Sequence, residues 1–179
     1  MKKIKKFATI DIGSNAIRLL ISNIYTKDSK IFATKNSLVR VPVRLGQDAF
    51  KKGKISKINI TRLIDSMKSF QLIMKVHNVE KYLAYATSAL RSSSNGELIV
   101  NEILNKTGLR VEIISGSKEA KIITNNNKSF SGNCDGTFGP EFLEFEVGGH
   151  GGALVFINFI FCSWKLIHIV RTTNKITFS

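Results

Sequence analysis

The sequence predicts an α/β fold in which a mixed sheet is flanked by helices. Two apolar, β-rich segments open the chain, at Phe7–Ile12 and Arg18–Tyr25. From Ser56 onward, apolar side chains at three- and four-residue spacing alternate with short strand-like runs. Helices that alternate with strands after an initial meander indicate a sheet that is antiparallel on one side and parallel on the other.

The first two segments read as a hairpin, with the N-terminal strand buried. Two further β-like stretches follow, at Ile31–Asn36 and Val39–Leu45. We expect the strand pattern to stop there, because Gly46, Asp48 and Gly53 break it before the first helix begins.

The first predicted helix begins after Ser56, which can cap it, and ends at His77 and Asn78. Its apolar residues recur on one face, as in a helix that covers a sheet. These residues are Ile60, Leu63, Ile64, Met67, Phe70 and Met74. The pattern assigns them to the core.

The second half of the predicted fold repeats strand and helix. Lys81–Thr87 reads as a short strand, and Asn95 is a good N-cap for a helix that ends at Gly108. Val111–Ile114 is another strand, and a further helix begins around Ser117.

The composition favours a protein that meets polyanions in a reducing compartment. Lys and Arg number 27 against 13 Asp and Glu, which gives a net charge of +14 and a pI near 10.0. Such an excess attracts nucleic acid, anionic membranes or a phosphate polymer, although a lysine-rich surface alone would also produce it. The two cysteines have no metal-like spacing, which fits the cytoplasm.

Two of these partner classes are poorly supported by the sequence. Aromatic residues sit in apolar runs and do not interleave with Lys and Arg, so we expect no specific nucleic-acid site. The most membrane-like segment, Ala153–Val170, contains Asn158, Lys165 and His168. It is a weak candidate beside the roughly 20 largely apolar residues of a spanning helix, and we expect no membrane partner.

The turn after the first strand carries the first candidate site. Gly13 lets the backbone approach an anion, and Ser14 and Asn15 add side-chain donors. Arg18 follows at a spacing that could reach a phosphate, and Asp11 could bind Mg²⁺ through water. The simpler alternative is a tight hairpin with a solvent-facing acid.

Two later turns offer further polar groups. Thr87, Ser88 and Arg91 could donate to phosphate oxygens, or they could form an ordinary capped strand-to-helix turn. Glu119 lies in the first turn of a predicted helix, where an acid complements the helix dipole. Its functional alternative is a general base aimed at a water beside a bound phosphate.

Four segments in register resemble the exopolyphosphatase / guanosine pentaphosphate phosphatase (Ppx/GppA) family. They are IDIGSNAIRLLI (10–21), LVRVPVRLG (38–46), ATSALR (86–91) and VEIISGSKEA (111–120). That family belongs to the actin–hexokinase–heat-shock-ATPase superfamily, with two ribonuclease H-like domains around a cleft. The resemblance implies that residues 11–15 form a phosphate loop with Asp11 near Mg²⁺. It also implies that Arg18 and Arg91 contact phosphate and that Glu119 is the catalytic base.

The resemblance weakens at the second phosphate loop. After a loop-like stretch at 125–139 and a predicted strand at Phe142–Val147, Glu146 stands in place of the family's aspartate. Gly148 and Gly149 match the family's glycines and are expected to bind phosphate. The Ser, Thr and Glu that the family has next are replaced by residues 151–153, which are Gly, Gly and Ala. Glu146, one methylene longer than the family's aspartate, is expected to be a metal ligand with Asp11.

We expect a ribonuclease H-like phosphatase domain at 1–124, a loop with the altered motif at 125–153, and a divergent tail at 154–179. The family continues into a second domain, so we hypothesise a truncated gene with a frameshift near 125–150, which translation of the other frames would test. An exposed domain face would make a homodimer plausible.

The resemblance predicts Mg²⁺-dependent release of terminal phosphate from inorganic polyphosphate or guanosine pentaphosphate. The alternative is an impaired fragment that binds polyphosphate or guanosine tetraphosphate without hydrolysis. A sugar or acetate kinase of the same superfamily is less compatible, because no adenosine-binding segment is visible.

Overall fold

The computed structural model describes residues 4–27 and 30–120 and confirms the mixed α/β sheet. A further helical segment begins at residues 116–120. In chain order, the elements are β1 Lys5–Ile12, β2 Ile17–Lys27, β3 Lys30–Val41, α1 Leu45–Lys52, α2 Lys57–Val76, β4 Lys81–Ala86, α3 Ser88–Arg91, α4 Gly96–Thr107 and β5 Glu112–Ile113.

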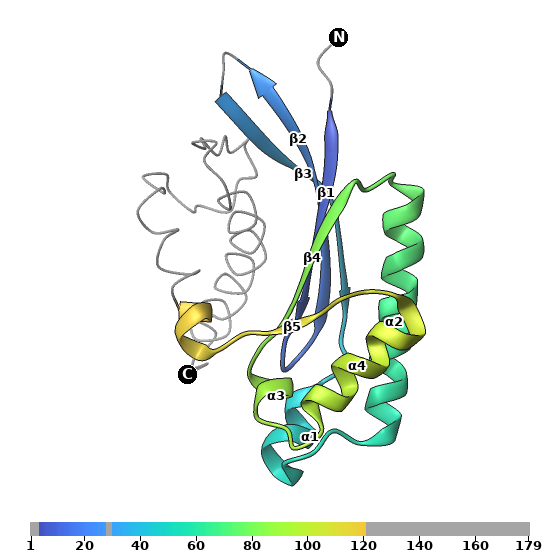
Figure 1. The fold of residues 1–179 in the computed structure, drawn as a ribbon, viewed down its shortest axis with the longest axis vertical. Helices are drawn as coiled ribbons and strands as arrows, with labels where there is room; N and C mark the ends of the chain where they lie inside the picture. Colours follow the sequence, from blue (N-terminus) through green and yellow to red (C-terminus); the bar gives the residue numbers. More distant parts are fainter. Residues whose placement is uncertain (1–3, 28–29, 121–179) are drawn as a thin grey trace, which may run out of the picture.

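The sheet has the strand order β3-β2-β1-β4-β5. The pairs β3/β2 and β2/β1 are antiparallel, whereas β1/β4 and β4/β5 are parallel. Figure 1 shows α2 and α4 on one face of the sheet, and α1 and α3 at the end where β1 turns into β2. The predicted division into an antiparallel and a parallel side is therefore confirmed.

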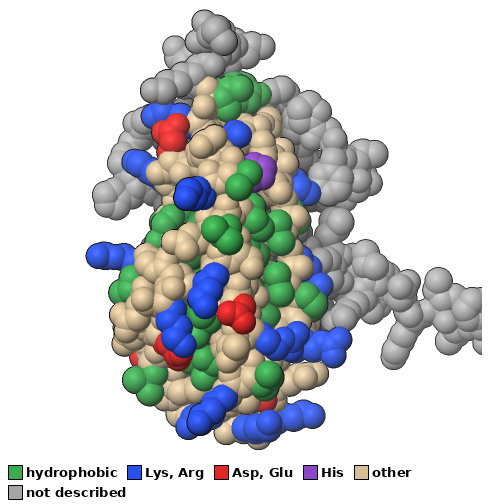
Figure 2. All heavy atoms as spheres, turned by 90° about the vertical axis from the view of Figure 1, so that its right-hand side faces the viewer, with side chains coloured by type: hydrophobic (Ala, Val, Ile, Leu, Met, Phe, Trp, Pro, Cys, Tyr) green, Lys and Arg blue, Asp and Glu red, His purple; other side chains and the backbone are tan. Residues whose placement is uncertain are grey.

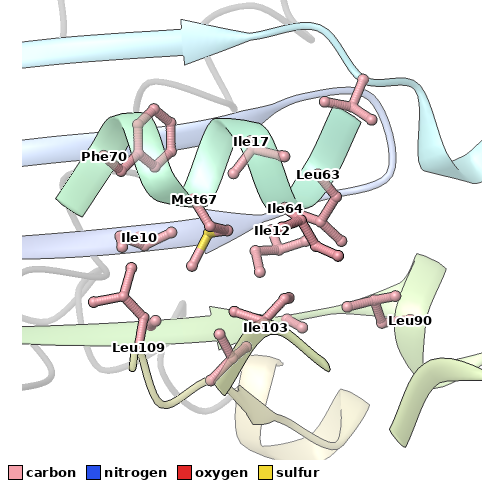
Figure 3. Close-up of a cluster of buried hydrophobic side chains, with 14 of the residues drawn as sticks. Ile10, Ile12, Ile17, Leu63, Ile64, Met67, Phe70, Leu90, Ile103 and Leu109 are labelled. Atoms are coloured by element: carbon pink, nitrogen blue, oxygen red, sulfur yellow. The ribbon is translucent and has the colours of Figure 1, made fainter. Parts of the chain in front are cut away.

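The core lies between the sheet and the helices α2 and α4. The predicted apolar stripe of α2 packs on β1 and β2, with Leu63, Met67 and Phe70 almost fully buried (Figure 3). Ile103 of α4 joins the same cluster. Because each such side chain stabilises the fold by about 1.5–3 kcal/mol when buried, this stripe is the main attachment of the helices to the sheet.

The segment between the third strand and Ser56 differs from the sequence prediction. The two predicted β-like stretches are one strand that ends at Val41, and Leu45 begins a helix instead of ending a strand. Pro42 has no N–H to donate to the ladder, and Arg44 adopts a left-handed conformation with φ 60° that redirects the chain. Of the two glycines that suggested a break, Gly46 lies in the first turn of α1 and Gly53 caps its C-terminal end.

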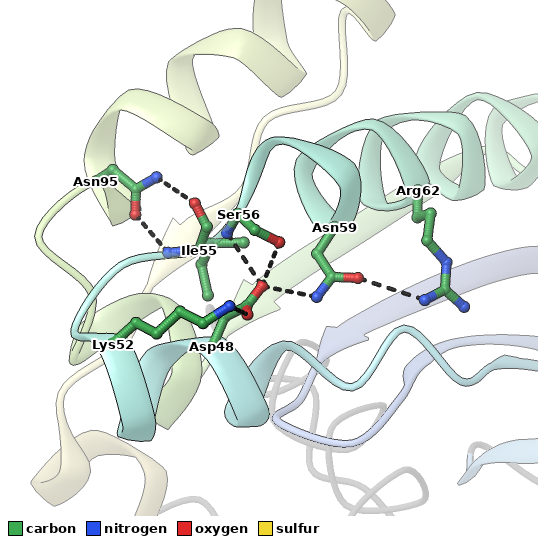
Figure 4. Close-up of polar contacts among 7 residues, drawn as sticks. All are labelled: Asp48, Lys52, Ile55, Ser56, Asn59, Arg62 and Asn95. Carbon is green, nitrogen blue, oxygen red and sulfur yellow. Dashed lines mark hydrogen bonds and ion pairs between the residues drawn. The ribbon is translucent and has the colours of Figure 1, made fainter.

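The predicted caps stand at the helix starts, but their side chains bond elsewhere (Figure 4). The Asn95 amide accepts from the Ile55 N–H and donates to the Ile55 carbonyl, both at 3.0 Å. The Ser56 hydroxyl donates to Asp48. Both residues therefore join separate segments of the chain, which sequence-local capping rules do not foresee.

Asp48 is the centre of this connection. Its carboxylate accepts from the Ser56 N–H at 3.1 Å, the Asn59 amide at 2.8 Å and Lys52 Nζ at 3.1 Å, besides the Ser56 hydroxyl. These hydrogen bonds, of which those from Ser56 have the largest effect, hold the pKa of Asp48 well below its ordinary value. The buried carboxylate thus fixes α1 against the start of α2.

We expect Asp48→Asn to lower the free energy of unfolding by about 2–3 kcal/mol at pH 7, because a neutral amide cannot accept all these bonds. A carboxyl with a lowered folded-state pKa stabilises the fold above its ordinary pKa, and that contribution disappears as the pH falls through the folded-state value. Urea unfolding at pH 7 and below pH 4 should therefore show a smaller acid effect in the variant. Asp65→Asn, at an exposed ion pair with Lys68, is the control. An equal loss of unfolding free energy in the two variants at pH 7 would contradict the role of Asp48.

Candidate functional site

Three strand ends meet at one edge of the sheet. The parallel register places Ile12 beside Ala86, and Ala86 beside Ile113. The ladder continues one step further, since the Thr87 N–H donates to the Ile12 carbonyl at 3.2 Å and the Ile114 N–H to the Ala86 carbonyl at 3.0 Å. The three turns singled out in the sequence therefore lie next to one another, beside α1 and α3 (Figure 1).

The first turn is closed tightly and buttressed by α1. The Gly13 N–H donates to the Ala16 carbonyl, while the carbonyl of Ser14 accepts from Gly46 at 2.8 Å and that of Asn15 from Arg44 at 3.0 Å. Within residues 4–27 and 30–120, the N–H groups of Ser14 and Asn15 donate to no backbone carbonyl. The carbonyls of Ser14, Asn15 and Ala16 are thus engaged, whereas the adjacent N–H groups of Ser14 and Asn15 make no backbone hydrogen bond within the described part of the chain.

Gly46 makes this approach possible. A Cβ at this position would lie 2.9 Å from Ser14 Cβ and 3.0 Å from the Phe50 ring. Any larger residue would push the first turn away from α1. The local sequence pattern predicts only a break at Gly46, which also ends the family-like segment 38–46, and it carries no sign of the close contact with Ser14.

The second turn contacts the first through two hydroxyls. Ser14 Oγ and Ser88 Oγ are 2.8 Å apart. Thr87 is buried, and its Oγ1 has no hydrogen-bond partner among the residues that the structure describes. The structure therefore brings Ser14 and Ser88 together, and the phosphate contact expected of Thr87 stays a prediction.

Asp11 lies at the end of β1 and is paired with Arg18 across the hairpin. Arg18 Nη1 donates to Asp11 Oδ2 at 2.9 Å, and both side chains are buried. Burial raises the pKa of Asp11 to about 6, although Arg18 opposes the shift; the Glu119 charge raises it further. The contact with Asp11 uses Nη1 of Arg18, and the phosphate contact expected of Arg18 from the sequence stays a prediction.

The third turn brings Glu119 toward the same edge. Arg91 Nη1 donates to Glu119 Oε2 at 3.0 Å and to the Ile114 carbonyl at 2.8 Å. The Glu119 side chain is largely enclosed, with 14 % exposed, against 33 % for Arg91. The predicted base and the predicted phosphate ligand are therefore partners in this structure.

A neighbouring cluster was not predicted. Lys118 Nζ pairs with Glu112 at 2.5 Å and lies 5.2 Å from the centre of the Tyr85 ring. Partial burial raises the pKa of Tyr85. Only the β4–β5 register reveals that Tyr85 and Glu112 are neighbours, so the sequence alone carried no signal for this cluster.

The donor set at this edge suits a hard cation that keeps its own water. No group of three or more His, Cys, Asp or Glu that could hold a metal is found in the described ranges. Mg²⁺ is commonly bound by one or two carboxylates, with waters and substrate phosphates completing its shell. Asp11, with Glu119 close enough to affect its charge, fits that mode. Glu146, Gly148 and Gly149 lie outside the described residues, as do the predicted strand 142–147 and the segment 153–170.

The basic charge is spread over the surface. Figure 2 shows Lys and Arg side chains across the face on the α2 and α4 side, with few acidic ones among them. Exposed examples on α1 and α2 are Lys51, Lys52, Lys57, Arg62, Lys68 and Lys75. Among the described residues, no helix is long and apolar enough to cross a membrane.

Known proteins resemble this chain in sequence. The profile described as the Ppx/GppA phosphatase family matches residues 25–128. The chain belongs to the Ppx/GppA phosphatase family. A bifunctional 3-dehydroquinate synthase/phosphatase of Fusobacterium nucleatum is 32% identical over 146 residues, which are 79% of this chain and 21% of that protein. Exopolyphosphatase 1 of Mycobacterium leprae is 25% identical over 117 residues, 65% of this chain and 34% of that protein.

Solved Ppx/GppA structures share the fold. The Aquifex aeolicus family member matches with a TM-score of 0.61 at 29% identity. The match covers 68% of this chain and 38% of that protein. An exopolyphosphatase from Cytophaga hutchinsonii matches with a TM-score of 0.64 at 26% identity, and the match covers 88% of this chain and 53% of that protein. The sheet is thus the actin-like, ribonuclease H-like one expected from the resemblance. The chain spans about a third of the length of the Mycobacterium leprae relative.

We expect Gly46→Ala to lower the free energy of unfolding by about 1–3 kcal/mol, because the added Cβ would overlap Ser14 and Phe50. Urea unfolding measures the loss. The neighbouring exposed Gln47→Ala should stay within about 0.5 kcal/mol of the parent chain. Gly46→Ala as stable as Gln47→Ala would mean that the contact between α1 and the first turn is not tight.

Proposed function

We propose that the chain is a Mg²⁺-dependent phosphohydrolase of the exopolyphosphatase type, releasing terminal phosphate from inorganic polyphosphate or guanosine pentaphosphate. The observation that carries the proposal is the convergence of three turns at one sheet edge, with Ser14 against Ser88 and Glu119 near Asp11. Membership of a family that includes exopolyphosphatases supports it. The choice between the two substrates rests on the resemblance alone.

The first two turns are suited to hold the terminal phosphate. The proposed donors to phosphate oxygens are the N–H groups of Ser14 and Asn15 and the one hydroxyl hydrogen that the Ser14–Ser88 pair leaves unused. Fixed donors of this kind stabilise developing charge without reorganising. Gly13 is proposed to allow the close backbone approach, and Thr87 stays a predicted phosphate donor.

Glu119 is proposed as the general base. It accepts a proton from water while the water oxygen forms a bond to phosphorus, and the bond to the bridging oxygen breaks. The leaving group is the shortened polyphosphate or guanosine tetraphosphate. Positioning of the water against the phosphate accounts for most of the rate enhancement in such reactions.

Asp11 would hold the magnesium ion, with Glu146 as a second proposed ligand. When bound, Mg²⁺ would neutralise charge on the phosphate oxygens. Arg18 fixes the Asp11 carboxylate through its 2.9 Å ion pair, so that one oxygen keeps a constant orientation. Arg18 as a direct phosphate ligand stays a prediction.

A second candidate function is binding without hydrolysis. The chain spans 34% of the length of the Mycobacterium leprae exopolyphosphatase, and the expected second phosphate loop lacks the family's Ser, Thr and Glu at residues 151–153. Saturable binding of polyphosphate or guanosine tetraphosphate, with no phosphate released, would favour this candidate.

Glu119→Gln should lower the rate of phosphate release from long-chain polyphosphate with Mg²⁺ by about 10²–10⁴-fold, because the amide cannot take up the proton. Phosphate release is measured with the full chain. Glu112→Gln, a nearby exposed glutamate that pairs with Lys118, is the matched control and should retain the parent rate within about threefold. A Glu119→Gln rate within about threefold of the parent would exclude Glu119 as the base.

The KM for long-chain polyphosphate should rise steeply with salt, since the +14 charge attracts the polymer through interactions that salt screens. Tripolyphosphate, with fewer charges to contact, should show a shallower dependence. Initial rates between 50 and 300 mM KCl test both. Equal slopes for the two substrates would mean that the basic surface does not recruit the polymer.

A further inference from the structure

Arg91 is tied to the turn that carries Glu119 by contacts on several sides. Its Nη1 donates to the Ile114 carbonyl at 2.8 Å and to Glu119 Oε2 at 3.0 Å. Its Nη2 lies alongside Gly116, 3.8 Å from where a Cβ on that residue would be. The guanidinium therefore lies across the whole turn from the end of β5 to the following helix.

The two ends of this connection are separately anchored. The Arg91 N–H donates to the Thr87 carbonyl, which fixes its backbone beside the second turn. The Ser115 hydroxyl accepts from the Lys118 N–H at 3.1 Å, and the Glu119 N–H donates to the Ser115 carbonyl at 2.9 Å. With both backbones held, the Arg91–Glu119 pair determines where the long glutamate side chain points.

The Glu119 carboxylate needs such a partner. Within the described part of the chain, Arg91 is the side chain that donates a hydrogen bond to it. The buried Asp11 carboxylate lies close enough to interact with it unfavourably. Without a cation beside it, Glu119 would turn toward solvent and away from the first turn.

We propose that Arg91 is a positioning residue, which acts on the reaction by holding the Glu119 carboxylate against the phosphate turns. This differs from the direct phosphate contact expected of Arg91 from the sequence. The two hydrogens of Arg91 Nη1 are already used by the Ile114 carbonyl and by Glu119, so this nitrogen serves the turn that carries Glu119. The inference rests on the proposed role of Glu119 as the base.

A double-mutant cycle on the full chain separates the two roles. Arg91→Ala should lower kcat for polyphosphate by about 10–100-fold, as misplacement of a reacting group does, with KM within about threefold of the parent. In a Glu119→Gln background, Arg91→Ala should have little further effect, because residues that act as a unit are not additive. Arg91→Lys should restore part of the rate.

The matched control is Arg62→Ala. Arg62 also donates to a main-chain carbonyl, that of Pro42 at 3.2 Å, but it lies on the exposed side of α2. The Arg62→Ala variant should keep kcat within about twofold of the parent value. Urea unfolding of each variant identifies losses caused by unfolding, and Arg91→Lys carries the test if Arg91→Ala does not fold.

Each outcome decides the inference. A KM raised more than about tenfold at constant kcat would make Arg91 a phosphate ligand, and so would losses of kcat that multiply in the double variant. Either result would overturn the positioning role and leave the proposed function standing. A folded parent chain that releases no phosphate with Mg²⁺ would overturn the proposed function, and this inference with it. A kcat loss confined to the chain with an intact Glu119 supports the positioning role.

Discussion

The parallel pairing of β1 with β4 is the constraint on which the site depends. It places the end of β1 beside the end of β4, and through β4 beside β5, so that three turns distant in sequence share one edge. A slip of one residue would turn Asp11 to the opposite face and bring an apolar neighbour in its place. The packing of α2 on β1 and β2 resists such a slip, because the apolar residues of the strands face that helix.

The same edge contains a carboxyl group whose charged form is disfavoured by burial, that of Asp11. Asp11 is buried with a pKa of about 6, so between pH 3.8 and 6 the folded chain binds more protons than the unfolded one. The contribution of Asp11 to stability therefore falls as the pH rises through this range. A buried ion pair with Arg18 offsets only part of the desolvation. A fold selected for stability alone would place an apolar pair at these two positions. The presence of a buried ion pair is therefore consistent with a site that needs the Asp11 carboxylate.

Residue patterns predict the parts of the structure that local rules control. The apolar stripe of α2, the hairpin β1–β2 and the parallel side of the sheet all follow from spacing and element order. The helix α1 was missed, because Gly46 and Gly53 resemble breaks when the contact with Ser14 is unknown. The partners of Arg91 and Asn95 could not be predicted in this way, since each lies in a chain segment far away in sequence. Asp11, the partner of Arg18, is only seven residues away, and the register of the hairpin pairs the two residues directly.

The hydroxyl pair between Ser14 and Ser88 has a consequence for hydrogen counting. Two hydroxyls that bond to each other at 2.8 Å use one of their two hydrogens between themselves, and either oxygen can be the donor. One hydrogen is then left to point outward, from Ser14 in one arrangement and from Ser88 in the other. A concerted rotation of both O–H bonds exchanges the two arrangements without moving a heavy atom. The edge can thus present its single outward hydroxyl hydrogen from either turn, following whichever oxygen of an anion comes nearer.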